Sequence, residues 1–131
     1  MAKYVYPAVF TKETEGGYSV IFPDLEGCYT QGENMQEALE MAKDVLCYKL
    51  YDLEIEERMI PQPSDPLTLT HDEQSFISLI DCDTIEYRKF FDNKAVKKTL
   101  TLPAWLNRMA EQAELNFSQI LQGALKEKLK I

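Results

Sequence analysis

The strongest constraint on this fold is an alternating segment near the C-terminus that has no partner strand of its own. Residues 98–102 alternate strictly, so a strand there would point Leu100 and Leu102 to one face. The residues on its other face would be Lys97, Thr99 and Thr101. Only helical patterns follow, so the backbone groups of this strand need a second strand from outside the segment.

Two short helices are predicted after this segment. Pro103 suits the first turn of a helix, where its missing N–H costs nothing. Asn116 can cap the second helix, and Gln119 three residues later completes a capping box. The apolar positions of the first helix are Leu106, Met109, Ala110 and Ala113. Those of the second are Phe117, Ile120, Leu121, Ala124, Leu125 and Leu129.

One strand and two short helices bury too little apolar surface to fold alone. A second copy of the chain, with its strand antiparallel, would pair the strands and close four helices over a shared core. The predicted dimer-core residues are Leu100, Leu102, Leu106, Ile120, Leu121 and Leu125. The resulting two-stranded ribbon has the width that the major groove of DNA accepts.

The outward residues of this ribbon have the chemistry for reading base edges. Lysine donates to guanine acceptors and the threonine methyl group contacts thymine, so we predict base reading by Lys97, Thr99 and Thr101. The start of the second helix offers N–H groups to a phosphate. The predicted phosphate-binding residues are Lys98, Asn116, Phe117 and Ser118. The alternative is a ribbon that serves only dimerisation.

Charge divides the chain into two parts. Residues 1–93 hold 19 acids and 7 Lys or Arg, for a net charge of −12. Residues 94–131 hold 3 acids and 7 Lys or Arg, for +4. A polyanion is repelled by the first part and attracted by the second, which favours two modules with different partners. The alternative is that the acidic charge only keeps the first part soluble.

The first part predicts a small sheet with one long helix. The expected strands are 4–11, 18–22, 28–31 and 74–80. Gly16 and Gly17 turn the first hairpin, and Pro7 favours an edge position or a bulge in the first strand. Asn34 and Glu37 form a capping box for a helix to about Leu53. Its apolar stripe is Met35, Ala38, Leu39, Ala42, Val45, Leu46, Leu50 and Leu53, with the Lys49 stem at its edge.

Two resemblances cover nearly the whole chain. Lys-Lys-Thr-Leu-Thr-Leu-Pro, followed by a helix and by Asn-Phe-Ser-Gln, resembles ribbon-helix-helix repressors of the Arc and MetJ type. Glu114 departs from that pattern, which often has glycine there. Residues 3–52, with the run from Gly16 to Glu33 and then Glu37-Ala38-Leu39, resemble the HicB antitoxin family. Glu26 stands where that family often has proline.

The resemblance to HicB implies a partial RNase-H-like N-terminal domain and a HicA-type partner. That partner would be a small basic toxin that cleaves mRNA with a histidine, and the antitoxin would cover its active site. Asp24 and Glu26 are candidate toxin-binding residues. The second module would bind operator DNA and repress the operon that encodes both proteins. The net charge of −12 independently suits a basic partner.

No catalytic site, metal site or cofactor is predicted. Two-metal hydrolysis needs carboxylates that converge on metals roughly 4 Å apart, but the first strand has no acid. His71 lies in a polar loop and is interpreted as a surface residue. Cys28, Cys47 and Cys82 are odd in number without metal-like spacing, which predicts small buried side chains in a reducing compartment. With no signal peptide or membrane span in the sequence, we expect a cytoplasmic protein.

The sequence therefore predicts a non-enzymatic α+β protein with an N-terminal β-β-β-α-β domain and a C-terminal ribbon-helix-helix module. The expected divisions are 1–82 for the toxin-binding domain, 83–93 for a linker that can form a short helix, and 94–131 for the dimerising DNA-binding module. We expect a homodimer, with association into a tetramer left open. The alternative function is a transcriptional regulator whose N-terminal domain senses a small ligand.

Overall fold

The computed structural model describes residues 3–131, and these divide into two compact units. The first, unit 1, runs to Lys94, and the second, unit 2, runs from Ala95 to Ile131. Each is described by itself. The α+β class expected from the sequence is confirmed, because unit 1 contains an antiparallel sheet and both units contain helices.

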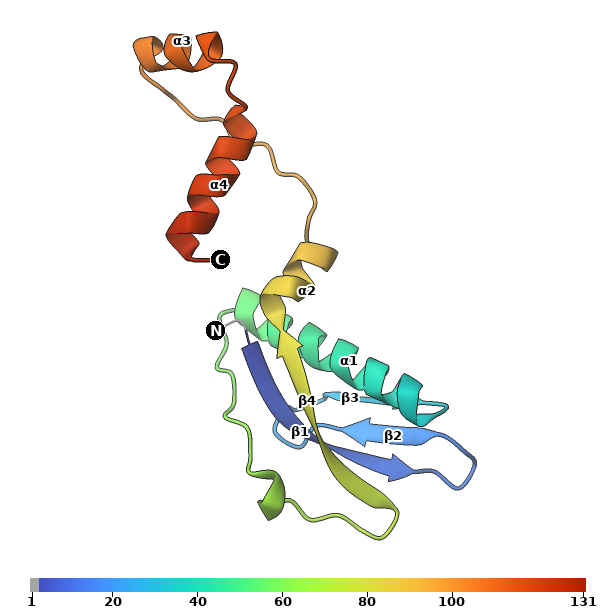
Figure 1. Ribbon diagram of the computed structural model, residues 1–131. Coiled ribbons are helices and arrows are strands. Elements are labelled where there is room, and N and C mark those ends of the chain that lie inside the picture. The colour runs from blue at the N-terminus through green and yellow to red at the C-terminus, as the bar shows by residue number, and fades with distance from the viewer. Residues whose placement is uncertain (1–2) are drawn as a thin grey trace. The chain divides into compact units, whose positions relative to one another are not determined.

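Unit 1 is built on a four-stranded antiparallel sheet (Figure 1). Its strands are β1 (Lys3–Lys12), β2 (Tyr18–Ile21), β3 (Tyr29–Gly32) and β4 (Ser75–Asp83). They lie in the order β3-β2-β1-β4, so the last strand pairs with the first. Gly16 and Gly17 have positive φ between β1 and β2, as a tight hairpin turn requires. The predicted β-β-β-α-β order is confirmed.

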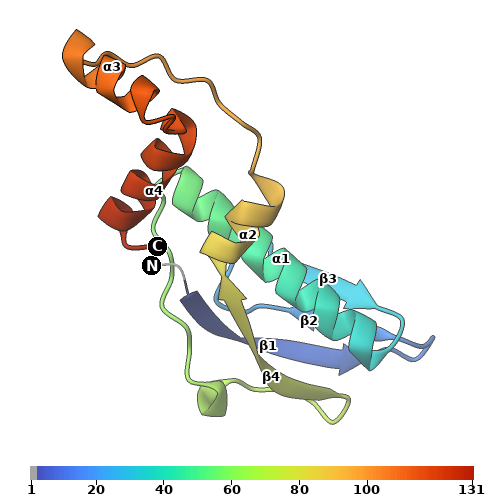
Figure 2. The same ribbon diagram turned by 45° about the horizontal axis from the view of Figure 1, so that its top comes forward.

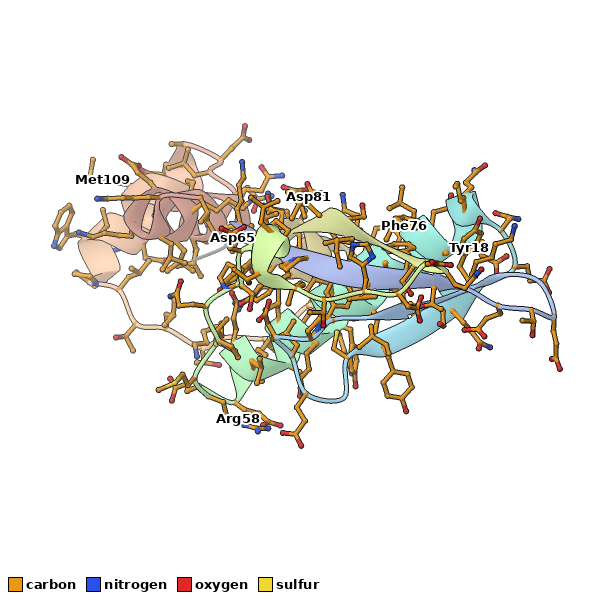
Figure 3. All side chains as sticks on the ribbon, turned by 90° about the horizontal axis from the view of Figure 1, so that it is seen from below. Tyr18, Arg58, Asp65, Phe76, Asp81 and Met109 are labelled. Carbon is orange, nitrogen blue, oxygen red and sulfur yellow. The ribbon has the colours of Figure 1, made fainter. Side chains whose placement is uncertain are left out.

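Helix α1 (Met35–Ile55) lies along one face of this sheet (Figures 1 and 2). Alternation in β1 points Tyr6, Ala8 and Phe10 towards the helix. At one end of the sheet, Tyr18 from β2 and Phe76 from β4 lie side by side in an edge-to-face contact (Figure 3). This face and the helix together enclose the hydrophobic core of unit 1.

The buried stripe of α1 is narrower than the sequence indicates. Its buried residues are Ala38, Ala42, Leu46, Cys47, Leu50 and Leu53. Met35 and Leu39, expected in the stripe, are exposed, whereas Cys47, expected to be buried but not assigned to the stripe, belongs to it. A helix that contacts a small sheet mainly along one row of residues spaced four apart leaves the flanks of that row in solvent.

The start of α1 packs unusually close to β3. Asn34 caps the helix by accepting a hydrogen bond from the Glu37 N–H at 2.8 Å, as predicted. Gly32 ends β3 two residues before this cap, and a Cβ there would lie 2.3 Å from the Ala38 nitrogen. Only glycine fits at this position without moving the helix.

Strand β4 is longer than expected, continuing past Ile80 to Asp83. Cys82 continues the buried alternation opposite Tyr4, while Asp81 lies exposed between two buried neighbours. The sequence does not indicate this longer strand, because acidic residues occupy the positions between its buried ones. Pro7 lies in the half of β1 that pairs with β4 but not with β2, so the edge position expected for it applies locally.

Helix α2 (Thr84–Phe91) begins where β4 ends, and it packs against α1. The carboxylate of Glu54, near the end of α1, accepts hydrogen bonds from Tyr4 at 2.7 Å, Thr84 at 3.0 Å and Arg88 at 2.7 Å. Most of the expected linker 83–93 is therefore a helix held within unit 1.

Unit 2 contains the two predicted helices, α3 (Ala104–Gln112) and α4 (Phe117–Leu129). Pro103 immediately precedes α3, and Asn116 caps α4 by accepting from the Gln119 N–H at 3.1 Å. Glu114, between the helices, has φ 54° in the left-handed region that glycine favours. Among residues 3–131, no helix is long and apolar enough to cross a membrane.

Candidate nucleic-acid and protein interfaces

The predicted ribbon segment is an exposed, extended stretch without regular secondary structure from 93 to 103. The three predicted base-reading residues, Lys97, Thr99 and Thr101, are all exposed there. No strand of the described chain pairs with this segment. Because a strand is defined by its ladder of hydrogen bonds, the ribbon itself stays a prediction that requires a second chain.

Unit 2 has almost no interior of its own. Neither α3 nor α4 contains a buried residue, although both carry apolar stripes. The side chains of Leu100, Leu102 and Ile120 have between half and two thirds of their surface exposed. Exposing this much apolar surface to water is unfavourable. The apolar contacts within unit 2 bury too little surface to hold its two helices together. Unit 2 therefore has an open half-core, that is, a set of apolar side chains that need a complementary surface to become buried.

The exposed apolar side chains of unit 2 line a groove of about 700 Å³. It runs between the extended segment and the two helices, entirely within unit 2. Its lining residues are Lys98, Leu100, Leu102, Ala104, Asn107, Phe117, Ser118, Ile120, Leu121 and Ala124. Four of the six predicted dimer-core residues lie in it, and Leu106 and Leu125 do not. Phe117 and Ala124, predicted on the apolar face of the second helix, also line it, whereas Ala104 and Asn107 were not predicted.

Most of the predicted phosphate-binding residues line the same groove. Lys98, Phe117 and Ser118 line it, which brings together three of the four residues. Asn116 does not line it, because its side chain caps the helix. Phe117 and Ser118 are the first two residues of α4, where backbone N–H groups have no acceptor within the helix. An anion placed there would meet two N–H donors and the positive end of the helix dipole.

Unit 1 carries a second candidate interface on the face of its sheet opposite α1. Strand pairing places Tyr29, Ile21, Val9 and Ile77 side by side across all four strands. We call this set the outer-face row. Tyr29 is 68% exposed and Ile21 is 53% exposed. Val9 and Ile77 are partly buried. A continuous apolar row that is partly exposed on a sheet face is typical of a protein-binding surface. Each of these residues alternates with buried ones along its own strand, but only the strand pairing brings the four together.

The two acids named as candidate toxin contacts have different surroundings. Asp24 is partly buried, and its carboxylate accepts hydrogen bonds from the backbone N–H of Ser64, at 2.9 Å, and from the Ser64 hydroxyl. Asp24 therefore ties the loop after α1 to the turn between β2 and β3. Glu26, in the same turn, is exposed. Of the two, Glu26 has the carboxylate that remains open to solvent.

The described residues contain no group of three or more His, Cys, Asp or Glu side chains placed to hold a metal ion. His71 is exposed, and its ring nitrogen lies 3.2 Å from the backbone oxygen of Asp72. All three cysteines are buried free thiols, as the sequence predicts.

The sequence matches a family model and several curated proteins among bacterial antitoxins. Residues 6–123 match the family model of the HicB-like antitoxins of bacterial toxin-antitoxin systems. Over 68 residues the chain is 46% identical to antitoxin HicB of Escherichia coli strain K12, which covers 51% of this chain and 47% of that protein. Antitoxin HicB 1 of Photorhabdus laumondii is 42% identical over 60 residues, covering 44% of this chain and 39% of that protein. The matches thus span less than half the length of these curated relatives.

Solved structures match the chain over nearly its whole length. A chain of the toxin-antitoxin complex from Streptococcus pneumoniae superposes with a TM-score of 0.62 at 35% identity, covering 96% of this chain and 99% of that one. Antitoxin HicB of Burkholderia pseudomallei has a TM-score of 0.55 at 16% identity, covering 96% and 98%, and shares the fold. Since the family model spans most of the sequence, the chain belongs to the HicB-like antitoxins of bacterial toxin-antitoxin systems.

Proposed function

We propose that this protein is a cytoplasmic antitoxin that binds and neutralises a HicA-type mRNA interferase toxin and, as a homodimer, represses its own operon by binding operator DNA. The family membership supports the first activity, and the uncovered half-core of unit 2 supports the second. The observation that carries the proposal is the division of one chain into an acidic unit with an exposed sheet face and a basic unit with an open groove.

The open groove of unit 2 supports the proposed dimer and its binding to DNA. A second copy, paired through residues 98–102, would add the same leucines and cover the groove from the other side. In that ribbon Lys97, Thr99 and Thr101 face outward, opposite Leu100 and Leu102. The net charge of +4 over residues 94–131 would attract the ribbon to DNA. The N–H groups of Phe117 and Ser118 would bind a DNA phosphate and so position the dimer along the duplex.

The acidic charge and the outer-face row of unit 1 support the proposed binding of a toxin. Residues 1–93 carry a net charge of −12, which favours encounter with a basic protein. The outer-face row gives such a partner an apolar surface to bury, while the charge steers the approach. We propose the row as the centre of the toxin contact and Glu26 as a contact at its rim. The resemblance to an RNase-H-like fold is proposed for unit 1 on its three-stranded meander followed by a helix.

The proposal describes a protein that acts by binding and has no catalytic role. A hydrolase would need converging carboxylates. Of the acids in and beside the sheet, Asp83 caps α2, Asp24 is held by Ser64, and Glu54 is held by Arg88.

Co-expression with a HicA-type toxin tests the toxin contact. Ile21→Asp puts a charge in the centre of the outer-face row without entering the core, because Ile21 is half exposed. We expect this variant to lose the toxin in affinity purification, with a loss of affinity of at least tenfold, about 1.4 kcal/mol or more. Growth of cells that carry both genes would fall in parallel.

Met59→Asp is the matched control. Met59 is 90% exposed in the loop after α1 and lies outside the row, so the same charge there should leave toxin capture unchanged. Equal capture by wild type and Ile21→Asp would show that the toxin contacts another surface. Failure of the wild-type chain to capture or neutralise the toxin would overturn the antitoxin assignment itself.

A further inference from the structure

Strand β4 is an outer strand of the sheet in unit 1, and it pairs with β1 alone among the described strands (Figure 1). In an antiparallel pair, alternate residues point their N–H and C=O groups away from the neighbouring strand. Within residues 3–131, no backbone hydrogen bond from a loop or turn reaches residues 76–82. The short helical turn η1 (Pro66–Thr68) lies near β4 but does not pair with it. One edge of β4 is therefore open to a further strand.

Most of β4 lacks the features that usually protect an exposed edge. Natural edge strands are blunted by charged residues, proline or bulges, or are kept very short. Residues 75–80, Ser-Phe-Ile-Ser-Leu-Ile, contain no charge, no proline and no glycine. Only after them does a charged pair appear, where the Lys43 nitrogen on α1 lies 3.6 Å from the Asp81 carboxylate. The outer strand on the other side of the sheet, β3, has only four residues. We call residues 75–80 the open edge.

The open edge presents apolar side chains on both faces of the sheet. Phe76 lies on the face towards α1, where its ring stacks on that of Phe10 with 5.2 Å between the ring centres, yet 39% of Phe76 is exposed. Leu79 lies on the opposite face and is 57% exposed. A strand added beside β4 would place side chains next to both residues, because neighbours across two strands lie on the same face. Pairing at this edge would therefore bury apolar surface as well as form hydrogen bonds.

The charges around the open edge favour a basic protein over a second copy of this chain. Exposed acids lie at both ends of the edge, Asp72 and Glu73 before it and Asp81 after it. Two β4 strands paired antiparallel through residues 75–80 would bring the first two acids of one copy near Asp81 of the other. Like charges on facing strands are unfavourable, and residues 1–93 of each copy carry a net charge of −12. A strand with Lys or Arg at its two ends would meet opposite charges at both places.

We propose that the basic toxin binds unit 1 by adding an extended segment to the open edge, so that the segment becomes a fifth strand of the sheet beside β4. This inference rests on the proposed antitoxin function and gives its mode of binding. Backbone hydrogen bonds supply the pairing, while Phe76 and Leu79 select apolar side chains at alternate positions of the added segment. The outer-face row ends at Ile77 on β4, so the added strand continues the same surface.

Hydrogen exchange of the full chain, followed amide by amide by NMR with and without a HicA-type toxin, tests this mode of binding. In the free chain, the amides of residues 76–80 should alternate between slow exchange, for those bonded to β1, and fast exchange, for those facing the open edge. With saturating toxin we expect the fast set to slow by about tenfold or more, while the amide of Met59 in the loop after α1 stays fast.

The other outcomes of this measurement separate the two proposals. A toxin that binds while the alternate amides stay fast would overturn strand addition and leave the antitoxin function standing. A toxin that does not bind would overturn both. Protection of the alternate amides without toxin, rising with protein concentration, would identify a second copy as the occupant of the edge and overturn the proposal.

A proline variant tests the backbone donors of the edge directly. The N–H groups of consecutive strand residues point to opposite sides, so one of Ser78 and Leu79 faces the open edge, and its fast exchange in the free chain identifies it. Proline at that position removes the donor without breaking a bond to β1, and alanine at the same position is the matched control that keeps the N–H. We expect the proline variant to bind the toxin about tenfold more weakly than the alanine variant. Equal binding by the two would contradict strand addition, and the exchange measurement on the unaltered chain decides if the proline variant does not fold.

Discussion

Gly32 is the residue at which one methyl group would change the packing of unit 1 most directly. An added Cβ would lie 2.3 Å from the Ala38 nitrogen and 2.6 Å from its Cα, both in the backbone of α1. Backbone atoms cannot move aside as the end of a flexible side chain can. We expect Gly32→Ala to lower the free energy of unfolding of unit 1 by about 1–3 kcal/mol, measured by denaturant unfolding with circular dichroism.

Gly123 provides the control for that substitution. It lies inside α4, and a Cβ there would meet nothing within 4 Å. Gly123→Ala should therefore be neutral or stabilise the helix by up to about 1 kcal/mol. If Gly32→Ala unfolds at the same denaturant concentration as the wild type, the close approach of β3 and α1 is wrong.

At the scale of elements, the sequence predicts what local chemistry determines. The capping residues Asn34 and Asn116 begin helices in the structure as expected, because a cap needs only its own side chain and the next turn. The glycine turn between β1 and β2 likewise depends on local φ angles. Element order and type follow from such signals.

The parts that the sequence did not predict depend on contacts between distant residues. The exposure of Met35 and Leu39 depends on how wide the sheet is beneath α1, and the length of β4 depends on Tyr4 as a partner for Cys82. The hydrogen bonds of Glu54 to Tyr4 and Arg88 span 50 and 34 residues of sequence, so no periodicity reveals them. In the proposed sites, hydrophobic spacing indicated six of the groove residues, whereas the outer-face row is defined by the pairing of four strands.

The extended segment 93–103 and helices α3 and α4 should be stable only in a dimer. Leu100 lines the groove and is 61% exposed in the single chain, so Leu100→Asp places a charge in the predicted dimer core. We expect this variant to be monomeric at micromolar concentration in sedimentation experiments, because an unpaired buried charge costs several kcal/mol. Trp105, the one tryptophan of the chain, reports on unit 2, and its fluorescence should lose its cooperative unfolding transition.

Thr101→Asp is the matched control for the dimer. It introduces the same charge one position further along the segment, on the face predicted to point away from the core. This variant should stay dimeric while losing affinity for DNA. A dimeric Leu100→Asp, or a monomeric Thr101→Asp, would show that the ribbon is paired in another register or does not form.

At the scale of the whole molecule, the two units carry opposite net charges. Unit 1 holds most of the acids and the outer-face row, and unit 2 holds the exposed segment with Lys97 and Lys98 and the groove. A negatively charged unit would weaken DNA binding if it lay against the operator, and it suits a basic protein partner instead. The central claim is therefore that DNA binding and toxin neutralisation are separable activities of one chain.

The double variant Lys97→Ala with Thr99→Ala tests that claim most directly, with operator binding and toxin neutralisation measured on the same purified protein. Both side chains are exposed and neither lines the groove, so the dimer should persist. We predict loss of operator binding by at least a hundredfold, as expected for removing two base contacts in each half of a dimer, with toxin neutralisation unchanged. Loss of both activities together, or of neither, would contradict the division of function between the two units.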